Sequence, residues 1–517
     1  MAKILFFNFD GTDNEPADAM QNKNVFGTTE DDSITNILKF HLLIGGKLTH
    51  KCGSTKLANG SHSFYFNGVG TYGNYFQRKY NAALAKESLD VAKILRMAKK
   101  RFKKLYTPEN SFDYVVLTGF SRGAALARRF ALLINDQVKP NTIIEGVFDT
   151  VASIGMPNMK KQERPSSDVV FEYGHTLPSN VLKALHLLSL DDKRKAFQPT
   201  LMNQDSRVEE VWFAGAHSDV GGGYNFDGLS DNSLRYFLDW FEDQPELKLS
   251  FLSCKNVDCN TIFTQSSKLN IGKDDLQIDP NPLGVNHQQD RLPIFDRLTL
   301  TDRVCCVIQE DQIQQEIPPK VHWSVAERIR KDRNYRPPSL HNRAHYLQYQ
   351  DKTELLFDGA FEHKLISMGH FQVLDLAQKP SIETRAYAHF KYNHTGVYLE
   401  AGKTYQIEVI DLPNQKWKDG SIQAVDGEGW NRDDVRLGLK EIAIAAAEPF
   451  RRVTKKGAQW FSLCGCIGDE DTDAFVIGNK LEQFIPVKSG ELCVFANDLN
   501  GYYGNNSGYL KIRITLV

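Results

Sequence analysis

The sequence has 517 residues, 41% of them hydrophobic, which is enough for two or three domains with full-sized cores. Lys and Arg (62 residues) almost balance Asp and Glu (64 residues), so the chain has no general basic field and we expect no nucleic-acid partner. The eight cysteines are sparse for this length, and we predict mostly reduced thiols. In an exported protein, Cys464 and Cys466, together with Cys493, could instead be oxidised.

The N-terminal residues predict a β-strand at 3–9 and turn residues at 10–14. They lack the charged region, apolar segment and cleavage site of a secretory signal, and no run of about 18 apolar residues suggests a membrane-spanning helix. We therefore expect a protein made in the cytoplasm without a signal peptide and exported by a dedicated machine. An apolar strand before D-x-D-G-T is typical of haloacid-dehalogenase phosphatases, but Asn8 replaces their nucleophilic Asp and cannot form an aspartyl-phosphate.

Residues 119–123 read G-F-S-R-G, a match to G-x-S-x-G. A β-type apolar run precedes them at 114–117, and apolar residues recur at helical spacing from 124 to 134. This is the strand, turn and helix of a nucleophile elbow, in which the Ser sits on a strained turn between two obligatory glycines. The pattern predicts Ser121 as the nucleophile, although five-residue matches also arise by chance in a chain with 37 glycines.

The predicted elbow also indicates where an oxyanion could be bound. The backbone N–H of Arg122 lies at the start of the helix and can face the developing charge. In α/β hydrolases the loop after an early strand supplies the second donor, so we expect it at Gly11 or Thr12.

Two further β-type runs end in residues that suit the rest of a catalytic triad. The run at 142–148 ends at Asp149, and the run at 209–214 opens into a glycine-rich loop that contains His217. The tip of a parallel strand faces the crevice in which α/β proteins bind ligands. The order Ser, Asp, His along the chain is that of α/β hydrolases.

Each member of this triad has a separate chemical task. His217 would take the proton of the Ser121 hydroxyl, and Asp149 would fix the tautomer of the imidazole and stabilise its charged form. Asp219, in the same glycine-rich loop, and His322, just before a helix predicted at 324–331, are reserve candidates.

From residue 381 onward the sequence changes to short β-type runs separated by turns. These runs predict an antiparallel β-sandwich with a helix inserted at 436–447. The predicted strands are 388–392, 405–410, 475–477, 492–496 and 510–517. We place the domains at 1–375 and 376–517.

The last loop of this domain concentrates oxygen ligands. Asp498, Asn505 and Asn506 offer carboxylate and amide oxygens, and nearby glycines allow the backbone to wrap around an ion. Ca²⁺ prefers such donors, including backbone carbonyls. An Asn- and Gly-rich turn that binds no metal is the alternative.

Six blocks in the N-terminal part closely resemble the α/β-hydrolase phospholipase effectors of bacterial type VI secretion. They read F-D-G-T-D-N (9–14), G-V-G-T (68–71), G-F-S-R-G-A (119–124), G-V-F-D-T-V (146–151), A-H-S-D-V-G-G-G-Y (216–224) and H-W-S-V-A-E-R (322–328). The resemblance implies an α/β-hydrolase domain with a mostly parallel sheet. It places Ser121, Asp149 and His217 on the positions of the family's triad, and Asp219 and His322 on further motif positions.

The same resemblance implies a serine esterase, a phospholipase of the A1 or A2 type, that acts on glycerophospholipids at a membrane surface without a catalytic cofactor. It implies secretion on a spike or tube component of the type VI machine and action in the periplasm or membrane of a target cell. It also implies an immunity protein in the producing cell.

The C-terminal end is similar to the calcium-dependent galactose-binding lectins of bacteria, on the blocks N-D (497–498), Y-G-N-N-S-G (503–508) and Q-K-W (415–417). By this match Asp498, Asn505 and Asn506 bind Ca²⁺ through side chains, and Tyr502 and a residue near Asp411 bind it through backbone oxygens. The family's sugar-contacting His and Gln have no clear counterpart between 419 and 459, so a glycan partner is a weaker expectation than the lectin-like sandwich.

Two alternatives differ from a phospholipase effector. One is a carbohydrate esterase, in which the lectin-like domain holds the glycan. The other is a glycan-binding adhesin with an inactive hydrolase scaffold. A panel of phospholipids and acetylated sugars separates the two esterases, whereas loss of Ser121 leaves an adhesin functional.

Overall fold

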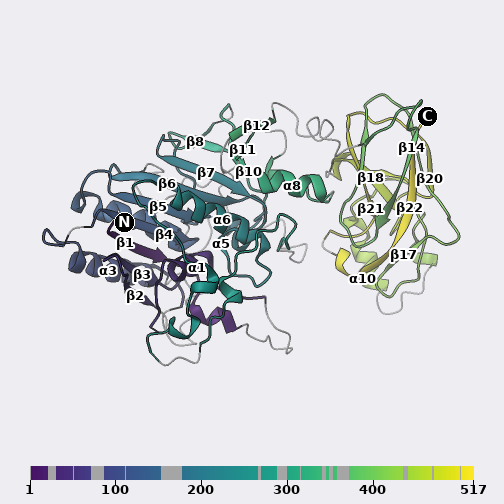
Figure 1. The fold of residues 1–517 in the computed structure, drawn as a ribbon. Coiled ribbons are helices and arrows are strands. Elements are labelled where there is room, and N and C mark those ends of the chain that lie inside the picture. The colour runs from purple at the N-terminus through teal and green to yellow at the C-terminus, as the bar shows by residue number, and fades with distance from the viewer. Residues whose placement is uncertain are drawn as a thin grey trace. The chain divides into compact units, whose positions relative to one another are not determined.

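The computed structural model describes residues 2–20, 31–49, 52–71, 87–110, 112–152, 177–265, 269–287, 300–314, 316–332, 334–340, 345–348, 353–357, 372–434, 441–468, 471–500 and 502–517. The chain divides into two compact units (Figure 1). Unit 1 comprises residues 1–289, 297–328 and 337–358, and unit 2 comprises 290–296, 329–336 and 359–517. The boundary predicted at 375/376 therefore lies inside unit 2. Within the described ranges, no helix is both long and apolar enough to cross a bilayer.

Unit 1 is built on a ten-stranded sheet with the order β12-β11-β10-β7-β6-β5-β4-β1-β3-β2. Adjacent strands of this sheet pair in parallel except at its two edges. There β2 pairs antiparallel with β3, and β12 pairs antiparallel with β11. The strands are β1 (Ile4–Phe9), β2 (Gly53–Lys56), β3 (His62–Phe66), β4 (Tyr114–Phe120), β5 (Ile143–Phe148), β6 (Val181–Ser189), β7 (Val208–Phe213), β10 (Lys320–His322), β11 (His345–Gln348) and β12 (Thr353–Phe357). The fold is thus mixed α/β with a large, mostly parallel sheet, as predicted.

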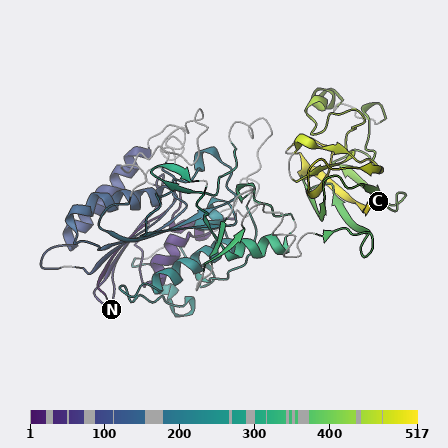
Figure 2. The same ribbon diagram turned by 90° about the horizontal axis from the view of Figure 1, so that it is seen from above.

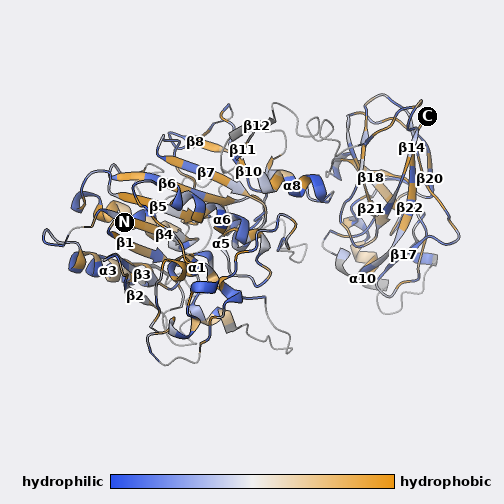
Figure 3. Ribbon diagram, in the orientation of Figure 1, coloured by the Kyte–Doolittle hydropathy of each residue, from blue (hydrophilic) through white to orange (hydrophobic). Residues whose placement is uncertain are grey.

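Helices cover both faces of this sheet, as the view along its edge shows (Figure 2). Successive side chains of a strand point to opposite faces, so Phe6 joins a cluster with α1 (Asn36–Leu43) and α6 (Gly228–Glu242), whereas Phe7 joins one with α3 (Glu87–Leu105) and α4 (Arg122–Ile134). Because both faces are buried, the central strands are almost continuously hydrophobic (Figure 3).

The remaining elements of unit 1 are shorter. Helix α5 (His217–Gly221) follows β7, and a two-stranded sheet pairs β8 (Val307–Gln309) with β9 (Gln312–Gln314). Helix α8 (Trp323–Lys331) follows β10 and has its last three residues in unit 2. The strands predicted at 3–9 and 114–117 and the helix predicted at 324–331 correspond to β1, β4 and α8.

One strand of the central sheet was missed by the sequence interpretation. β6 lies between β5 and β7, so the strand that ends at Asp149 is not a direct neighbour of the strand that precedes His217. Its sequence, V-L-K-A-L-H-L-L-S, contains Leu and Ala in place of most β-branched residues and carries a Lys and a His. Its strand conformation therefore depends on pairing with both neighbours rather than on local propensity.

Unit 2 contains two five-stranded sheets whose inner faces share one hydrophobic cluster. One sheet has the order β13-β15-β21-β18-β19, and the other has β14-β22-β16-β20 with β17 also paired to β22. The strands are β13 (Gln372–Val373), β14 (Ser381–Tyr387), β15 (Asn393–Leu399), β16 (Tyr405–Val409), β17 (Lys416–Asp419), β18 (Leu463–Ile467), β19 (Phe475–Val476), β20 (Lys480–Phe484), β21 (Gly490–Ala496) and β22 (Asn506–Leu516). All pairs are antiparallel except β13 with β15.

Two predictions in unit 2 need correction. The strand predicted at 388–392 is instead a turn between β14 and β15, in which the Phe390 N–H donates to the Tyr387 carbonyl at 3.4 Å. The inserted helix predicted at 436–447 is described only from Glu441 to Ala447, as α10, because its predicted start lies outside the described residues.

Candidate functional site

The G-x-S-x-G segment forms a tight turn between β4 and α4. Ser121 occupies this turn with φ 59° and ψ −125°, in a range that residues other than glycine rarely adopt. Its N–H donates to the Phe148 carbonyl at 3.0 Å, and its carbonyl accepts from the Val151 N–H at 3.2 Å. The two partners, Phe148 and Val151, lie on either side of Asp149 in the chain. Ser121 and Asp149 therefore lie together at the carboxyl ends of β4 and β5.

Both glycines of the motif are required by close backbone contacts. A Cβ on Gly119 would lie 2.4 Å from the Gly123 carbonyl oxygen, and a Cβ on Gly123 would lie 2.3 Å from the carbonyl oxygens of Phe9 and Asp10. The second contact packs the first turn of α4 against the end of β1. It thereby holds the loop that contains Gly11 and Thr12 next to the turn that carries Ser121.

His217 completes the group of three residues. Its Nδ1 is hydrogen-bonded to Asp149 Oδ2, and both side chains are almost fully buried. Its ring lies between Phe120, with centroids 4.6 Å apart, and Phe197, 5.0 Å away. Its Nε2 is buried and has no hydrogen-bond partner among the described residues. Phe120, which packs against the imidazole, directly precedes Ser121 in the chain, but no hydrogen bond joins Nε2 to the Ser121 hydroxyl among the described contacts.

Arg303 is a buried member of this site that the sequence interpretation missed. Its guanidinium donates to both oxygens of Asp149, at 2.6 Å from Nη1 and 2.9 Å from Nη2. It also donates to the backbone carbonyls of Ser189 and Phe197, at 2.8 and 2.5 Å. No motif surrounds Arg303, and an isolated Arg so far from Asp149 in the chain gives no local signal of this contact.

The charges around the acid and the imidazole define their protonation. Burial acts to raise the pKa of Asp149, but the Arg303 charge and the His217 contact outweigh it and hold that pKa far below its ordinary value. Burial lowers the pKa of His217, although its hydrogen bond to Asp149 partly opposes the shift. At neutral pH the site therefore holds an ionised carboxylate beside a neutral imidazole, the state that a general base requires.

The loop after β1 offers one of the two expected oxyanion donors. The Gly11 N–H donates to Asp10 Oδ1 at 2.7 Å and is therefore already engaged. Thr12 makes no backbone hydrogen bond within the described part of the chain, and its buried hydroxyl also has no partner there. Of the two candidates in this loop, Thr12 is the one whose N–H remains available. Arg122 is the first residue of α4, and the N–H groups at the start of a helix point out of its N-terminal end.

Asp219, the first reserve candidate, belongs to a different network. Its carboxylate accepts from the Ala216 N–H at 2.9 Å and contacts His287 Nδ1 at 2.5 Å. The other ring nitrogen of His287 contacts Asp31 at 2.8 Å, and the His287 ring stacks on Tyr224. Asp219 therefore supports the loop after β7, whereas the contact with His217 Nδ1 is made by Asp149.

His322, the second reserve candidate, is held inside the fold. Its Nδ1 contacts the Ser324 hydroxyl at 2.8 Å, and its ring stacks on Phe213 with centroids 4.4 Å apart. Burial lowers its pKa to about 3. Among the described contacts none joins His322 to Ser121, Asp149 or His217.

A second candidate site lies in unit 2, at the end of β21 and the start of β22. Asp498 Oδ2 accepts from Asn506 Nδ2 at 2.9 Å, and Asp419 Oδ1 accepts from Asn505 Nδ2 at 2.9 Å. The amide oxygen of Asn506, Oδ1, is buried and has no partner within the described chain. Burial and the nearby Asp419 charge raise the pKa of Asp498 to about 7, although its bond with Asn506 opposes the shift.

These oxygens fit a hard cation, because a bound ion would partner the Asn506 oxygen and offset the repulsion between the two carboxylates. Asp419 was not among the predicted ligands. Tyr502, which was predicted to contribute its backbone oxygen, lies in the same loop, where its N–H donates to the Leu499 carbonyl at 3.2 Å. The contacts described for Asp411 do not reach Asp498.

Comparison with known protein families finds one match, in the N-terminal part of the chain. A family model described as "T6SS, Phospholipase effector Tle1-like, catalytic domain" matches residues 3–138 and 135–240. The matched segments contain Ser121, Asp149 and His217, but end before Arg303. No curated protein matches the sequence.

Several solved structures match parts of this chain at low similarity. An uncharacterized protein from Pseudomonas aeruginosa is 19% identical over 46% of this chain and 45% of its own, with a TM-score of 0.28. A Tle1 effector bound to the VgrG spike of the type VI secretion system is 20% identical over 43% of this chain and 51% of its own, with a TM-score of 0.26. The N-terminal domain of EclA, a PllA-like lectin, is 20% identical over 27% of this chain and 98% of its own, with a TM-score of 0.18. This chain thus spans about half the length of the first two.

Proposed function

We propose that this chain is a lipase effector with an α/β-hydrolase domain that cleaves acyl esters of glycerophospholipids, because residues 3–240 match the family model of Tle1-like type VI secretion phospholipase effectors. The observation that carries the proposal is the buried Asp149–His217 pair, together with the backbone hydrogen bonds of Ser121 to Phe148 and Val151 that bring its strained turn next to Asp149. This arrangement suits acyl transfer to water.

In the proposed mechanism, His217 Nε2 accepts the proton of the Ser121 hydroxyl as the oxygen attacks the ester carbonyl. The N–H groups of Arg122 and Thr12 stabilise the negative charge of the tetrahedral intermediate. The imidazolium then protonates the leaving alcohol, and an acyl-Ser121 intermediate remains. A water molecule, deprotonated by His217, releases the fatty acid and restores the enzyme. Asp149, fixed by Arg303, keeps the proton of neutral His217 on Nδ1 throughout.

Replacement of Ser121 by Ala tests this mechanism. We expect ester hydrolysis to fall by several orders of magnitude while the protein stays folded, because residues of a triad act as one unit. Ser253→Ala removes an exposed hydroxyl from the same unit and serves as the control. Activity of Ser121→Ala at the level of this control would refute the assignment.

Lipid mass spectrometry defines the substrate. Incubation of wild type and Ser121→Ala with mixed bacterial lipids should show fatty acids and lysophospholipids that form only with the wild type. Isotope-labelled acyl chains at the sn-1 or sn-2 position then distinguish the A1 from the A2 type. A carbohydrate esterase would instead release acetate from acetylated glycans and leave these phospholipids intact.

The family also supports a proposal about delivery. We expect transport on a spike or tube component of the type VI machine, action in the periplasm or membrane of the target cell, and an immunity protein in the producer. Competition between a producing strain and a sensitive strain tests this, because loss of either the secretion machine or Ser121 should abolish killing. Killing that requires the machine but not Ser121 would favour the adhesin alternative.

For unit 2 we propose a lectin-like β-sandwich that binds Ca²⁺ through Asp498, Asn505 and Asn506, with Asp419 and the backbone of Tyr502 nearby. The support is the buried Asn506 oxygen without a described partner and the raised pKa of Asp498. The ion would fix the loop before β22, and a bound glycan or lipid headgroup could use it as a ligand. Calorimetric titration with Ca²⁺, in wild type and Asp498→Asn, tests the site.

A further inference from the structure

Three side chains with metal-binding atoms meet on the outer face of one sheet in unit 2. His394 on β15 is the direct cross-strand partner of Cys493 on β21. Glu491 lies two residues before Cys493 and therefore points to the same face. Their neighbours Leu492 and Val494 point the other way, into the core between the two sheets. The strand register alone therefore brings an imidazole, a thiol and a carboxylate together.

The donor atoms of these residues converge closely. His394 Nδ1 is 2.8 Å from Glu491 Oε2 and 3.3 Å from Cys493 Sγ, and all three donor atoms lie within 4.8 Å of one another. Glu491 and Cys493 are buried. His394 Nδ1 thus faces both the carboxylate and the sulfur. It can carry at most one hydrogen, so it cannot donate a full hydrogen bond to both of them at once.

A cation in place of that hydrogen would satisfy all three donors. Bond lengths of about 2.0–2.3 Å to zinc in a tetrahedral site place nitrogen, oxygen and sulfur ligands roughly 3.4–3.6 Å apart. The observed separations of 2.8 and 3.3 Å from His394 Nδ1 need to widen by about half an ångström to match, and the Glu491–Cys493 separation, which is at most 4.8 Å, has to reach the same range. A thiolate favours Zn²⁺ over Ca²⁺ or Mg²⁺, which take oxygen ligands. We propose that His394, Glu491 and Cys493 form a zinc site in unit 2.

The surroundings of Glu491 help to orient its carboxylate. The Gly396 N–H donates to Glu491 Oε1 at 2.9 Å, which leaves Oε2 directed at His394. Arg336 Nε lies 3.4 Å from Oε2 and opposes a cation, whereas Glu491 and an ionised Cys493 supply two negative charges. Zn²⁺ binding therefore releases the thiol proton of Cys493.

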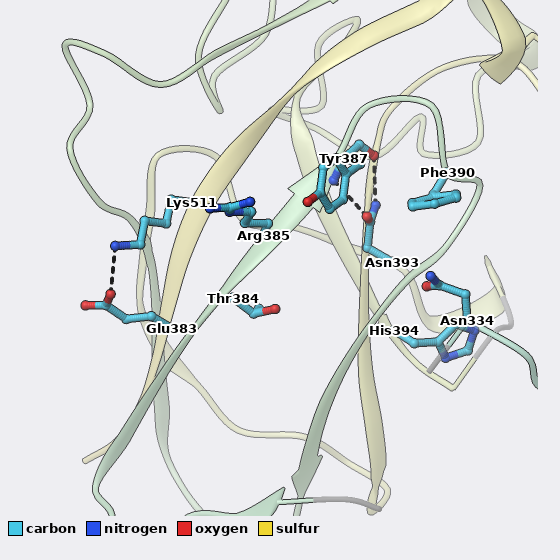
Figure 4. A pocket seen from close by; sticks show the side chains of 9 residues that line it. All are labelled: Asn334, Glu383, Thr384, Arg385, Tyr387, Phe390, Asn393, His394 and Lys511. Carbon is cyan, nitrogen blue, oxygen red and sulfur yellow. Dashed lines mark hydrogen bonds and ion pairs between the residues drawn. The ribbon is translucent and has the colours of Figure 1, made fainter. Parts of the chain in front are cut away.

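A cavity of about 390 Å³ lies beside this group (Figure 4). His394 lines one end of it together with Asn334 and Phe390, and Glu383 and Lys511 line the other end. The His394 side chain lines the cavity although only 6% of it is exposed, whereas Glu491 and Cys493 do not line it.

Metal binding by the purified full-length chain tests the site. The reduced protein is stripped with a chelator, loaded with Zn²⁺ or Co²⁺ and passed through gel filtration. We expect one retained ion per chain and, with Co²⁺, a sulfur-to-metal charge-transfer absorption. Cys493→Ser and His394→Gln should both lose the retained ion. Cys464→Ser removes a buried thiol from the neighbouring strand of the same sheet and should behave as wild type.

Zinc-edge X-ray absorption of the loaded wild type identifies the ligands of the ion directly. It needs no variant, so its result does not depend on whether a variant folds. We expect one sulfur and otherwise nitrogen or oxygen ligands around the ion. No retained zinc, no sulfur ligand, or equal retention in Cys493→Ser and wild type would each overturn the proposal. The site uses none of the residues of the proposed lipase or calcium site, so its failure would leave both untouched.

Discussion

Arg303 shows how one buried side chain can define the chemistry of others. Arg303 and Asp149 are both fully buried and share two hydrogen bonds. Removal of one partner from such a pair leaves the other charge buried and uncompensated. Removal of Arg303 also breaks the hydrogen bonds that hold the Asp149 carboxylate, which orients His217. Stability and catalysis should therefore fall together when Arg303 is replaced.

We expect Arg303→Met to lower the free energy of unfolding of unit 1 by about 3–5 kcal/mol. Denaturant unfolding of the full chain measures this. The control is Arg235→Met, which breaks the partly exposed contact with Asp239 one helical turn away and should cost only about 0.3–0.5 kcal/mol. Equal losses in the two variants would mean that the buried pair contributes no more to the free energy of unfolding than the partly exposed pair.

The environment of His217 leads to a prediction about pH. Burial lowers its pKa below the ordinary value of 6.5, so the imidazole stays neutral in mildly acidic solution. Because a general base must be unprotonated, kcat/KM for a soluble ester should fall on the acid side with a midpoint below 6.5. A pH–rate profile of wild type measures this, and a midpoint above pH 7 would contradict it.

At the scale of elements, the position of α4 depends on the absence of one side chain. Gly123 lies against the carbonyl oxygens of Phe9 and Asp10, and these backbone atoms have no flexible end that could move aside. The helix that follows Ser121 can therefore approach β1 only with glycine at this point. The same contact sets the distance between the elbow and the loop that carries Thr12.

Gly123→Ala should displace α4 from β1. We expect a loss of about 1–3 kcal/mol in stability, typical of overpacking, and a larger relative loss in kcat than in substrate binding, because the oxyanion donors move apart. Gly272→Ala, whose Cβ would meet its nearest neighbour at an ordinary 3.6 Å, is the control. Thermal unfolding and steady-state kinetics of both variants test this, and a fully active Gly123→Ala would contradict it.

At the scale of the whole molecule, the two units have separate hydrophobic cores and separate candidate sites. The proposed nucleophile belongs to unit 1, and the proposed Ca²⁺ ligands belong to unit 2. Ion binding should therefore stabilise unit 2 without altering the hydrolysis of a soluble ester. Membrane-bound lipid is a different substrate, because there a headgroup or glycan held by unit 2 would increase the local concentration of enzyme.

We expect Asp498→Asn, like removal of Ca²⁺ with a chelator, to lower the unfolding temperature of unit 2 and to leave hydrolysis of a short soluble ester unchanged. A proton competes with the ion on Asp498, whose pKa is raised to about 7, so the stabilisation by Ca²⁺ should fade as the pH falls below that value. Calorimetry with and without Ca²⁺ over this range, next to an ester assay, measures both effects. Stabilisation that persists in Asp498→Asn would place the ion elsewhere.

The sequence alone determined the features that depend on local chemistry. A strand, a glycine-flanked Ser and an amphipathic helix predicted the turn at Ser121, because each of these is encoded within a few residues. The short β runs after residue 381 likewise predicted two mainly antiparallel sheets, although one of the predicted strands, at 388–392, is a turn.

Tertiary structure decided the features that depend on residues far apart in the chain. β6 has weak strand propensity and is a strand because it pairs with β5 and β7. Arg303 reaches Asp149 and Asp419 reaches Asn505 only through folding, and no spacing within the sequence marks either contact. The physical reason is that a buried charge selects its partner by distance in space, whereas the patterns readable in a sequence are those of neighbours along the chain.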